Sequence, residues 1–208
     1  MYPLKIIGLG PGHRDYILPI AKKEIEAAEV IVCGVRHIES FDPTGKEILY
    51  IGKGTTLKDL LEEVAGIYKT RKTALVVSGD CGFYSLLSYA KKVIPIKDIV
   101  CIPGISSLQY FFAKLNLTWD DAQLISLHGR EIDLLPAFID NKKLGFLTDK
   151  THNTAFIART MDAAGIKNSR IYVGEDLSYA NEKITKLTVK EALDFKEGGL
   201  AVVVIVNE

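Results

Sequence analysis

Short apolar runs alternate with longer amphipathic stretches along the first half of the chain. A short apolar run bounded by glycine, proline or charged residues predicts a buried strand, and apolar residues spaced three and four apart predict a helix. The strands predicted in this half are Leu4–Gly8, Val30–Cys33, Glu47–Tyr50, Ala74–Val77 and Ile99–Ile102. Because helical patterns alternate with these strands, we expect a parallel sheet with helices on its faces.

Helices are predicted after most of these strands. The first begins near Pro19, a residue suited to the first helical turn, and its apolar face comprises Ile17, Ile20, Ala21, Ile25 and Ala28. The second follows Thr56, which forms a capping-box-like pattern with Asp59. The third begins at Phe83. Ser106 and Gln109 match a capping box at the start of the fourth, which ends near Asn116.

The second half of the chain begins a new unit after a short connector at 117–121. Its predicted strands are Ala122–Leu127, Leu144–Leu147, Arg170–Val173, Glu182–Leu187 and Leu200–Val206. Its predicted helices are Leu134–Ile139, capped by Asp133, then Thr154–Ala164, ending at Gly165, and a short one started by Thr188 and Glu191. The fully apolar last strand is expected to be central. We therefore predict two α/β domains, residues 1–116 and 122–208.

Composition excludes several classes of protein. The chain has 208 residues, with 26 basic and 26 acidic side chains, and zero net charge is atypical of a nucleic-acid or membrane-surface binder. Its longest apolar run, Leu200–Val206, is far shorter than a membrane span, and MYPLKIIGLG does not resemble a signal peptide. The three cysteines are odd in number and far apart, which disfavours a disulfide framework or a zinc site and favours a cytoplasmic protein.

The stretch ALVVSGDCGFYS at 74–85 is the first candidate ligand loop. Glycines on both sides of Asp80 let the backbone approach a ligand beyond the end of a strand. The Asp80 carboxylate disfavours a phosphate but is compatible with a ribose, an ammonium group or a sulfonium. The glycine-rich loop at 8–12 matches a dinucleotide fingerprint only loosely, because His13 stands where a glycine is needed. Cys81 is disfavoured as a nucleophile because no histidine is near it in sequence.

Basic pairs follow three of the predicted strands. They are His13 and Arg14, Arg36 and His37, and His128 and Arg130. Loops at the carboxyl ends of parallel strands share one rim, so we expect the pairs to lie together. Guanidinium groups bind carboxylates through two parallel hydrogen bonds, and such a rim would suit a ligand with several carboxylates.

Five motifs in order resemble the tetrapyrrole methylase family. They are GLGPG at 8–12, SGDCGFYS at 78–85, PGISS at 103–107, LTD at 147–149 and VGEDLSY at 173–179. The segments at 35–37, 126–130, 147–150, 157–158 and 173–179 further resemble the subgroup that methylates ring carbon C-5 of precorrin-7 or cobalt-precorrin-7. The chain departs from the family at Cys81, where proline is usual, at Asp176, where asparagine is common, and at Ala180-Asn181, where Pro-Asp is common.

The resemblance implies two α/β domains, the first with a mainly parallel five-stranded sheet and the second with a mixed sheet, and an S-adenosyl-L-methionine cleft between them. The cofactor-binding residues it implies are Leu9, Asp80, Phe83, Ser106, Ser107, Leu147, Leu177 and Ala201. The basic residues Arg14, Arg36, His37, His128 and Arg130 would hold the carboxylates of an anionic tetrapyrrole. No metal ligand and no covalent catalytic residue are expected.

The resemblance also favours a homodimer, and a separate C-15 methyltransferase and decarboxylase is expected because the chain stops after its last strand. Two alternatives stay open. One is another member of the superfamily, acting at a different ring carbon or on a protein or RNA. The other is a non-catalytic module that binds a nucleotide or a corrinoid.

Overall fold

The computed structural model describes residues 1–129 and 132–207. The chain divides into two compact units, Met1–Ser106 and Ser107–Glu208. This division falls before the helix that the sequence pattern assigned to the first domain.

The described part of the first unit contains a five-stranded sheet, as predicted. Its strands are β1 (Leu4–Gly8), β2 (Val30–Cys33), β3 (Glu47–Tyr50), β4 (Thr73–Val77) and β5 (Ile99–Ile102), in the order β3-β2-β4-β1-β5. Every pairing is parallel. The carboxyl ends of β2, β4 and β1 are therefore neighbours at one edge, and the loops that follow them meet there.

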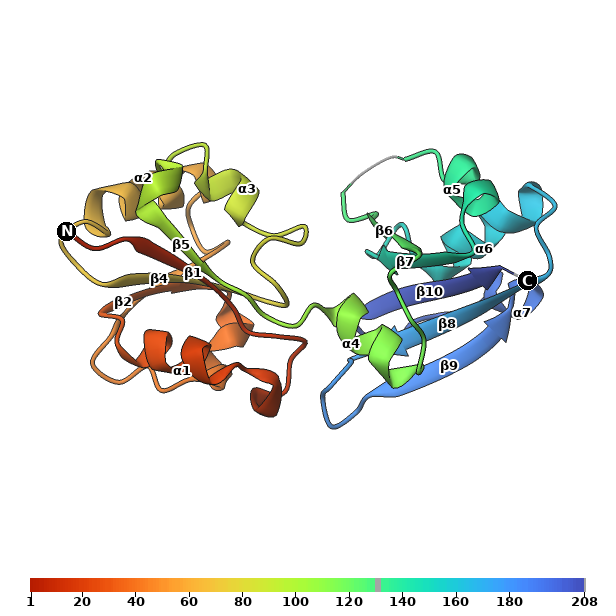
Figure 1. Cartoon of the computed structure of the whole chain (residues 1–208), viewed down its shortest axis with the longest axis horizontal. Coiled ribbons are helices and arrows are strands. Elements are labelled where there is room, and N and C mark those ends of the chain that lie inside the picture. Colours follow the sequence, from red (N-terminus) through yellow and green to blue (C-terminus); the bar gives the residue numbers. More distant parts are fainter. Residues whose placement is uncertain (130–131, 208) are drawn as a thin grey trace. The chain divides into compact units, whose positions relative to one another are not determined.

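Helices cover both faces of this sheet (Figure 1): α1 (Pro19–Glu26) lies on one face, and α2 (Leu57–Ile67) and α3 (Leu87–Ala90) lie on the other. Alternate strand residues supply the two cores, because side chains along a strand point to opposite faces. Leu75 and Val77 pack in the cluster with Leu61 of α2, whereas Val76 packs in the cluster with Ile25 of α1. Thr56 caps α2 by accepting a hydrogen bond from the Asp59 backbone N–H, as predicted.

Two local predictions in this unit were wrong. Ile20 was assigned to the apolar face of α1, but 46% of it is exposed. The helix predicted from Phe83 begins only at Leu87, because Tyr84 has a φ of 48° and cannot continue a right-handed helix.

The second unit contains a mixed sheet within the described residues. Its strands are β6 (Ala122–Ser126), β7 (Lys143–Leu147), β8 (Ser169–Glu175), β9 (Lys183–Thr188) and β10 (Ala201–Asn207), in the order β6-β7-β10-β8-β9. β6 pairs with β7 in parallel, and the other pairings are antiparallel. The predicted central position of the last apolar strand is confirmed.

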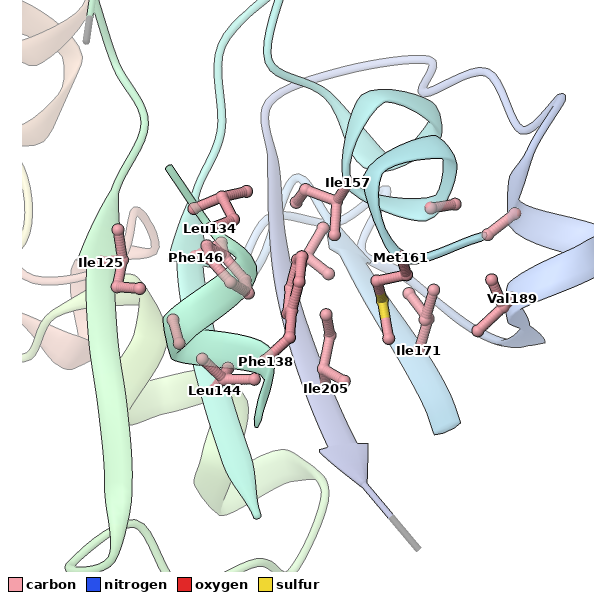
Figure 2. Packing of buried hydrophobic residues seen from close by; sticks show 14 of the residues in the cluster. Ile125, Leu134, Phe138, Leu144, Phe146, Ile157, Met161, Ile171, Val189 and Ile205 are labelled. Atoms are coloured by element: carbon pink, nitrogen blue, oxygen red, sulfur yellow. The ribbon is translucent and has the colours of Figure 1, made fainter. Parts of the chain in front are cut away.

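One face of this second sheet is covered by α5 (Leu135–Asp140), α6 (Thr154–Ala163) and α7 (Val189–Ala192). Figure 2 shows Ile157 and Met161 of α6 directed at strand residues that include Ile171 and Ile205. Phe138 of α5 packs against Phe146 of β7 with ring centroids 6.1 Å apart. The capping box predicted at the start of α7 is present between Thr188 and Glu191.

Helix α4 (Ser107–Lys114) packs on β7 and β10, which explains why it belongs to the second unit. A Cβ at Gly145 of β7 would lie 3.1 Å from Leu108 and 3.2 Å from Phe112, so this glycine allows the helix to approach the sheet closely. Gly174 of β8 serves the same purpose for Phe111, whose ring would lie 3.0 Å from a Cβ there. Within residues 1–129 and 132–207, the helices are too short or too polar to traverse a lipid bilayer.

Glycines hold the carboxyl edge of the first sheet together. A Cβ added at Gly8 would lie 2.5 Å from the Gly79 carbonyl oxygen and 2.7 Å from the Gly104 nitrogen, and one at Gly104 would also clash with the Gly79 carbonyl oxygen. The three loops that follow β1, β4 and β5 therefore contact one another through bare backbone.

We predict that Gly104→Ala lowers the free energy of unfolding by about 2 kcal/mol or more, because the new methyl group meets backbone atoms that cannot move independently. The midpoint of urea unfolding measures this loss. Gly66→Ala in α2 is the matched control, since a Cβ there meets nothing within 4 Å, and it should stabilise the protein by about 0.5–1 kcal/mol. Equal effects of the two substitutions would contradict the close-packing explanation.

Candidate functional site

The loops after β1 and β4 are joined at the carboxyl edge of the first sheet. Leu9 N–H donates to the Val77 carbonyl at 2.9 Å, and Gly10 and Gly79 exchange backbone hydrogen bonds of 3.1 and 2.8 Å. Leu9, a predicted cofactor residue, is 4% exposed, so its side chain belongs mainly to the core next to α1. Its backbone joins the loop after β1 to the end of β4 through this hydrogen bond to Val77.

The Asp80 carboxylate is occupied by backbone donors. Its Oδ1 accepts hydrogen bonds from Gly82 N–H at 2.8 Å and from Phe83 N–H at 3.2 Å, and its Oδ2 accepts one from Gly104 N–H at 3.1 Å. Asp80 therefore fixes the shape of loop 78–83 and ties it to the loop after β5. The sequence indicated that this residue is important, but the structure gives it an organising role through these amides.

Cys81 is part of the core in this loop. It is 5% exposed, and burial, followed by the neighbouring Cys101 and Asp80, raises the pKa of its thiol to about 12. A thiol with such a pKa stays protonated and is a weak nucleophile. The replacement of the usual proline thus supplies an apolar side chain to the cluster with Leu75 and Val77.

Arg36 and His37 converge on a residue that the sequence reasoning missed. Both lie in a 3₁₀ helix, Val35–Ser40, that follows β2, the strand next to β4. Arg36 Nη2 donates to Ser78 Oγ at 2.7 Å, and His37 Nε2 lies 2.7 Å from the same oxygen. Ser78 is the first residue after β4, and its position at a strand end beside a Gly-Asp turn was the only signal available in the sequence.

His37 is a neutral side chain at physiological pH. Burial and the adjacent Arg36 charge lower its pKa to about 4. Its Nδ1 accepts a hydrogen bond from Gly34 N–H at 3.3 Å, which also requires an unprotonated Nδ1. His37 therefore contributes a hydrogen-bond donor at this edge, and the permanent positive charge comes from Arg36.

His13 and Arg14 lie at the same edge, in the loop after β1. His13 Nδ1 accepts a hydrogen bond from Asp15 N–H at 3.3 Å and caps the 3₁₀ helix Arg14–Tyr16. Both side chains are exposed. The third basic pair follows β6, which is in the other sheet, so the prediction that one parallel sheet would place all three pairs on one rim was wrong.

Phe83 and Ser106 are the remaining predicted cofactor residues of the first unit, and Ser107 begins the second unit. The Phe83 ring is half-buried and meets the Tyr84 ring edge-on, with centroids 4.9 Å apart. Ser106 is the last residue of the first unit, and Ser107 is the first residue of α4. Both serines are half-buried.

In the second unit, the structure brings Leu147, Ala201 and Leu177 to one edge of the sheet. Leu147 ends β7 and is paired with Val202, while Ala201 begins β10 opposite Glu175. The Thr148 hydroxyl donates to the Ala201 carbonyl at 2.7 Å. Leu177 is 5% exposed and packs against Gly174, so it presents little surface, whereas Leu147 and Ala201 are half-buried.

His128 follows β6 at this same edge and is exposed, while Arg130 lies outside the described residues. The adjacent Gly129 N–H donates to Asp149 Oδ2 at 2.9 Å, and Asp149 Oδ1 accepts hydrogen bonds from Thr151 and His152 N–H groups. The His152 and Gly129 amides hold the pKa of Asp149 far below its usual range. This carboxylate, whose only signal in the sequence is its place in the LTD motif, organises the loops that follow β6 and β7.

Comparisons with known proteins agree with this architecture. The model of the tetrapyrrole (corrin/porphyrin) methylases matches residues 3–193. A probable cobalt-precorrin-7 C(5)-methyltransferase of Methanocaldococcus jannaschii is 35% identical over 193 residues, covering 89% of each chain. A cobalt-precorrin-7 C(5)-methyltransferase of Salmonella typhimurium is 30% identical over 186 residues, covering 89% of this chain and 90% of that protein.

The fold also matches a crystal structure of uroporphyrin-III C-methyl transferase from Thermus thermophilus complexed with S-adenyl homocysteine. The TM-score is 0.81 at 15% sequence identity, and the match covers 98% of this chain and 97% of that chain. At this identity the likeness shows the fold alone.

We predict that Asp80→Ala loosens the loop edge, because three backbone N–H groups lose their acceptor. The free energy of unfolding should fall by about 1–3 kcal/mol. Amide hydrogen exchange should accelerate at Gly82, Phe83 and Gly104, the three donors to this carboxylate. Asp120→Ala, at an exposed carboxylate, is the control. Unchanged exchange at these three amides would contradict the organising role of Asp80.

We also predict a pH-dependent contribution from Asp149. Its folded-state pKa is depressed, so its stabilisation is present above its unfolded pKa of about 4 and is lost as the pH falls toward the folded value. Asp149→Asn keeps one oxygen acceptor but cannot titrate. Between about pH 5 and about pH 2.5, the range in which carboxylates titrate, the stability of this variant should therefore decline less than that of the wild type. Parallel stability curves from urea unfolding would contradict this prediction.

Proposed function

Because the chain belongs to the tetrapyrrole (corrin/porphyrin) methylase family, we propose that it is the S-adenosylmethionine-dependent enzyme that methylates C-5 of cobalt-precorrin-7 or precorrin-7 in cobalamin biosynthesis. The observation that carries this proposal is the similarity along nearly the full length to two proteins named for C(5)-methylation of cobalt-precorrin-7, at 35% and 30% identity. Similarity that covers about nine-tenths of both chains includes the elements of both units.

The edge of the first unit fits an adenosyl ligand in its chemistry. Loops 8–12 and 78–83 lie beyond strand ends, the place where ligands bind in parallel α/β sheets. The half-buried Phe83 ring offers an apolar face, and Ser106 offers a hydroxyl group. Ser107, the first residue of the second unit, is proposed to offer another hydroxyl group to the cofactor. Asp80 supports this site by holding the backbone of its loop, and Leu9 supports it through its hydrogen bond to Val77.

In the second unit, Leu147, Leu177 and Ala201 are proposed to complete the cofactor site. Leu147 and Ala201 are half-buried at one sheet edge and offer apolar contact, whereas Leu177 supports them from the core. For the tetrapyrrole carboxylates we propose Arg14, Arg36, His37, His128 and Arg130 as before. His37 acts there as a neutral donor.

S-adenosylmethionine supplies an electrophilic methyl group on sulfur. A meso carbon of a tetrapyrrole is already enamine-like, so this chain needs mainly to hold the two reactants in line, and orientation alone is worth several kcal/mol. The carbon–sulfur bond breaks as the new carbon–carbon bond forms, and the product then loses one proton. The contribution of the residues is to bind and orient, and to keep water away from the sulfonium.

The family resemblance supports a homodimer, and the cysteine pattern supports a cytoplasmic location. We propose both, together with a separate protein for C-15 methylation and decarboxylation.

An assay with methyl-labelled S-adenosylmethionine and a panel of corrinoid intermediates tests the reaction. We expect label transfer to cobalt-precorrin-7 or precorrin-7, with the methyl group at C-5 by NMR. Transfer at another ring carbon would assign the chain to a different member of the family. The absence of both transfer and S-adenosylhomocysteine binding by calorimetry would favour a non-catalytic module.

Arg36→Ala should weaken binding of the tetrapyrrole by about tenfold or more, because a charge-assisted hydrogen-bond donor is removed. The affinity for S-adenosylhomocysteine should change by less than about threefold, which is no more than the loss of one neutral hydrogen bond would cause. Lys53→Ala, an exposed cation after β3 that lies over the Tyr50 ring, is the matched control. If Arg36→Ala instead abolished binding of S-adenosylhomocysteine and left binding of the tetrapyrrole unchanged, the proposed division of roles would be reversed.

A further inference from the structure

Ser78 lies where the proposed cofactor loop and the proposed substrate-binding basic pair meet. It is exposed, it opens loop 78–83, and its Oγ contacts both Arg36 and His37 at 2.7 Å. The partners in these contacts are 42 and 41 residues away along the chain, so the arrangement is a product of the fold. Neither the resemblance nor the sequence pattern assigns a role to this serine.

The hydrogen-bond roles of the three groups are determined by their chemistry. A guanidinium has donors only, so Arg36 Nη2 donates to Ser78 Oγ. His37 Nδ1 accepts from Gly34 N–H, so the single proton of the neutral ring is on Nε2, which also donates to Ser78 Oγ. The neutral form follows from the burial of His37 beside a cation.

A serine hydroxyl has two lone pairs and one proton. Arg36 and His37 use both lone pairs, so the O–H proton is directed away from them. Within residues 1–129 and 132–207, this proton forms no hydrogen bond to another group. It therefore faces the solvent side of the edge as a donor, and the adjacent guanidinium increases its polarity.

We infer that Ser78, Arg36 and His37 form a binding site for one carboxylate, in which the Ser78 hydroxyl donates the central hydrogen bond. One permanent positive charge matches one carboxylate better than a phosphate, which carries more negative charge. The inference deepens the proposed function, which supplies two sources of this chemistry. The acid side chains of the tetrapyrrole are the expected source, in line with the role proposed above for Arg36 and His37. The amino-acid carboxylate of the S-adenosyl ligand is the alternative source, and it would reverse that role.

Calorimetry on the full chain separates these sources. The probes are S-adenosylhomocysteine, 5′-methylthioadenosine, which lacks the amino-acid carboxylate, and uroporphyrin III, a polycarboxylate porphyrin. If the site takes the cofactor carboxylate, Ser78→Ala should lower the affinity for S-adenosylhomocysteine about 10- to 100-fold and leave the affinity for 5′-methylthioadenosine unchanged. If it takes a tetrapyrrole carboxylate, the same loss should appear for uroporphyrin III alone. Ser88→Ala, at an exposed serine bonded within its own turn, is the control for both.

The positioning role of His37 is tested by substitution with and without Ser78. His37→Gln keeps an amide donor near the Nε2 position and should retain most of the affinity, whereas His37→Phe should lose it. In the Ser78→Ala background, His37→Phe should add little, because its effect passes through the serine. Additive losses would contradict this coupling.

Two outcomes overturn the inference, and they differ. If the wild type binds the probes and Ser78→Ala binds all of them within twofold of wild type, the carboxylate site is refuted while the proposed function stands. If the wild type binds neither S-adenosylhomocysteine nor uroporphyrin III, the proposed function fails and the carboxylate site fails with it. Thermal unfolding of each variant establishes that it is folded.

Discussion

The close backbone approach of Gly8, Gly79 and Gly104 is the constraint on which the candidate site depends. Side chains at Gly8 and Gly104 would meet backbone atoms of neighbouring loops, including the Gly79 carbonyl oxygen, so the close approach depends on these two glycines. Gly79 itself has a φ of 63°, a backbone conformation that favours glycine. Asp80 strengthens this arrangement by accepting an amide hydrogen bond from Gly104 as well as two from its own loop. The result is a rigid edge whose backbone and flanking side chains have fixed positions, which is the preorganisation that a transfer between two bound molecules requires.

The second unit uses carboxylates in the same way. Glu197 accepts from Thr154 N–H at 2.6 Å, Glu175 accepts from Gly198 N–H at 2.6 Å, and Asp176 accepts from Leu200 N–H at 3.2 Å. These contacts hold the segment that leads into β10, and Ala201 follows directly. Hydrogen bonds from amides to charged oxygens are stronger than neutral ones, so a few acidic residues can define an irregular segment without a core of its own. The acidic side chains of this chain are thus partly structural, which explains why its charge balance is a poor guide to its ligands.

Periodicity and capping predicted most of the fold, because both are local properties. The five parallel strands of the first unit and the central β10 follow from apolar runs, and Thr56 and Thr188 identified helix starts by their spacing to acidic residues. The failures have physical causes that are not local. The positive φ of Tyr84 depends on the loop geometry around Asp80, and α4 belongs to the second unit because Gly145 and Gly174 give it room there.

The candidate site was predictable to a similar extent. The glycine motifs and the basic pairs marked the correct strand ends in the first unit, but the sequence could not show that β6 lies in a separate sheet from β1 and β2. It also could not show what each side chain contacts. Asp80 and Ser78 stand two residues apart, yet their contacts differ. The Asp80 carboxylate accepts hydrogen bonds from backbone amides, whereas the Ser78 hydroxyl contacts two side chains about forty positions earlier in the chain.

The neutrality of His37 changes how this chain would recognise an anion. A rim of several cations would attract carboxylates through its field, which ions screen over about 8 Å at physiological ionic strength. At this edge the permanent charge next to Ser78 is that of Arg36, and His37 adds a donor with a defined direction. Recognition then depends on the geometry of donors that the fold has already fixed, and much less on the number of charges. This is consistent with a chain of zero net charge that nevertheless places hydrogen-bond donors at the end of a central strand.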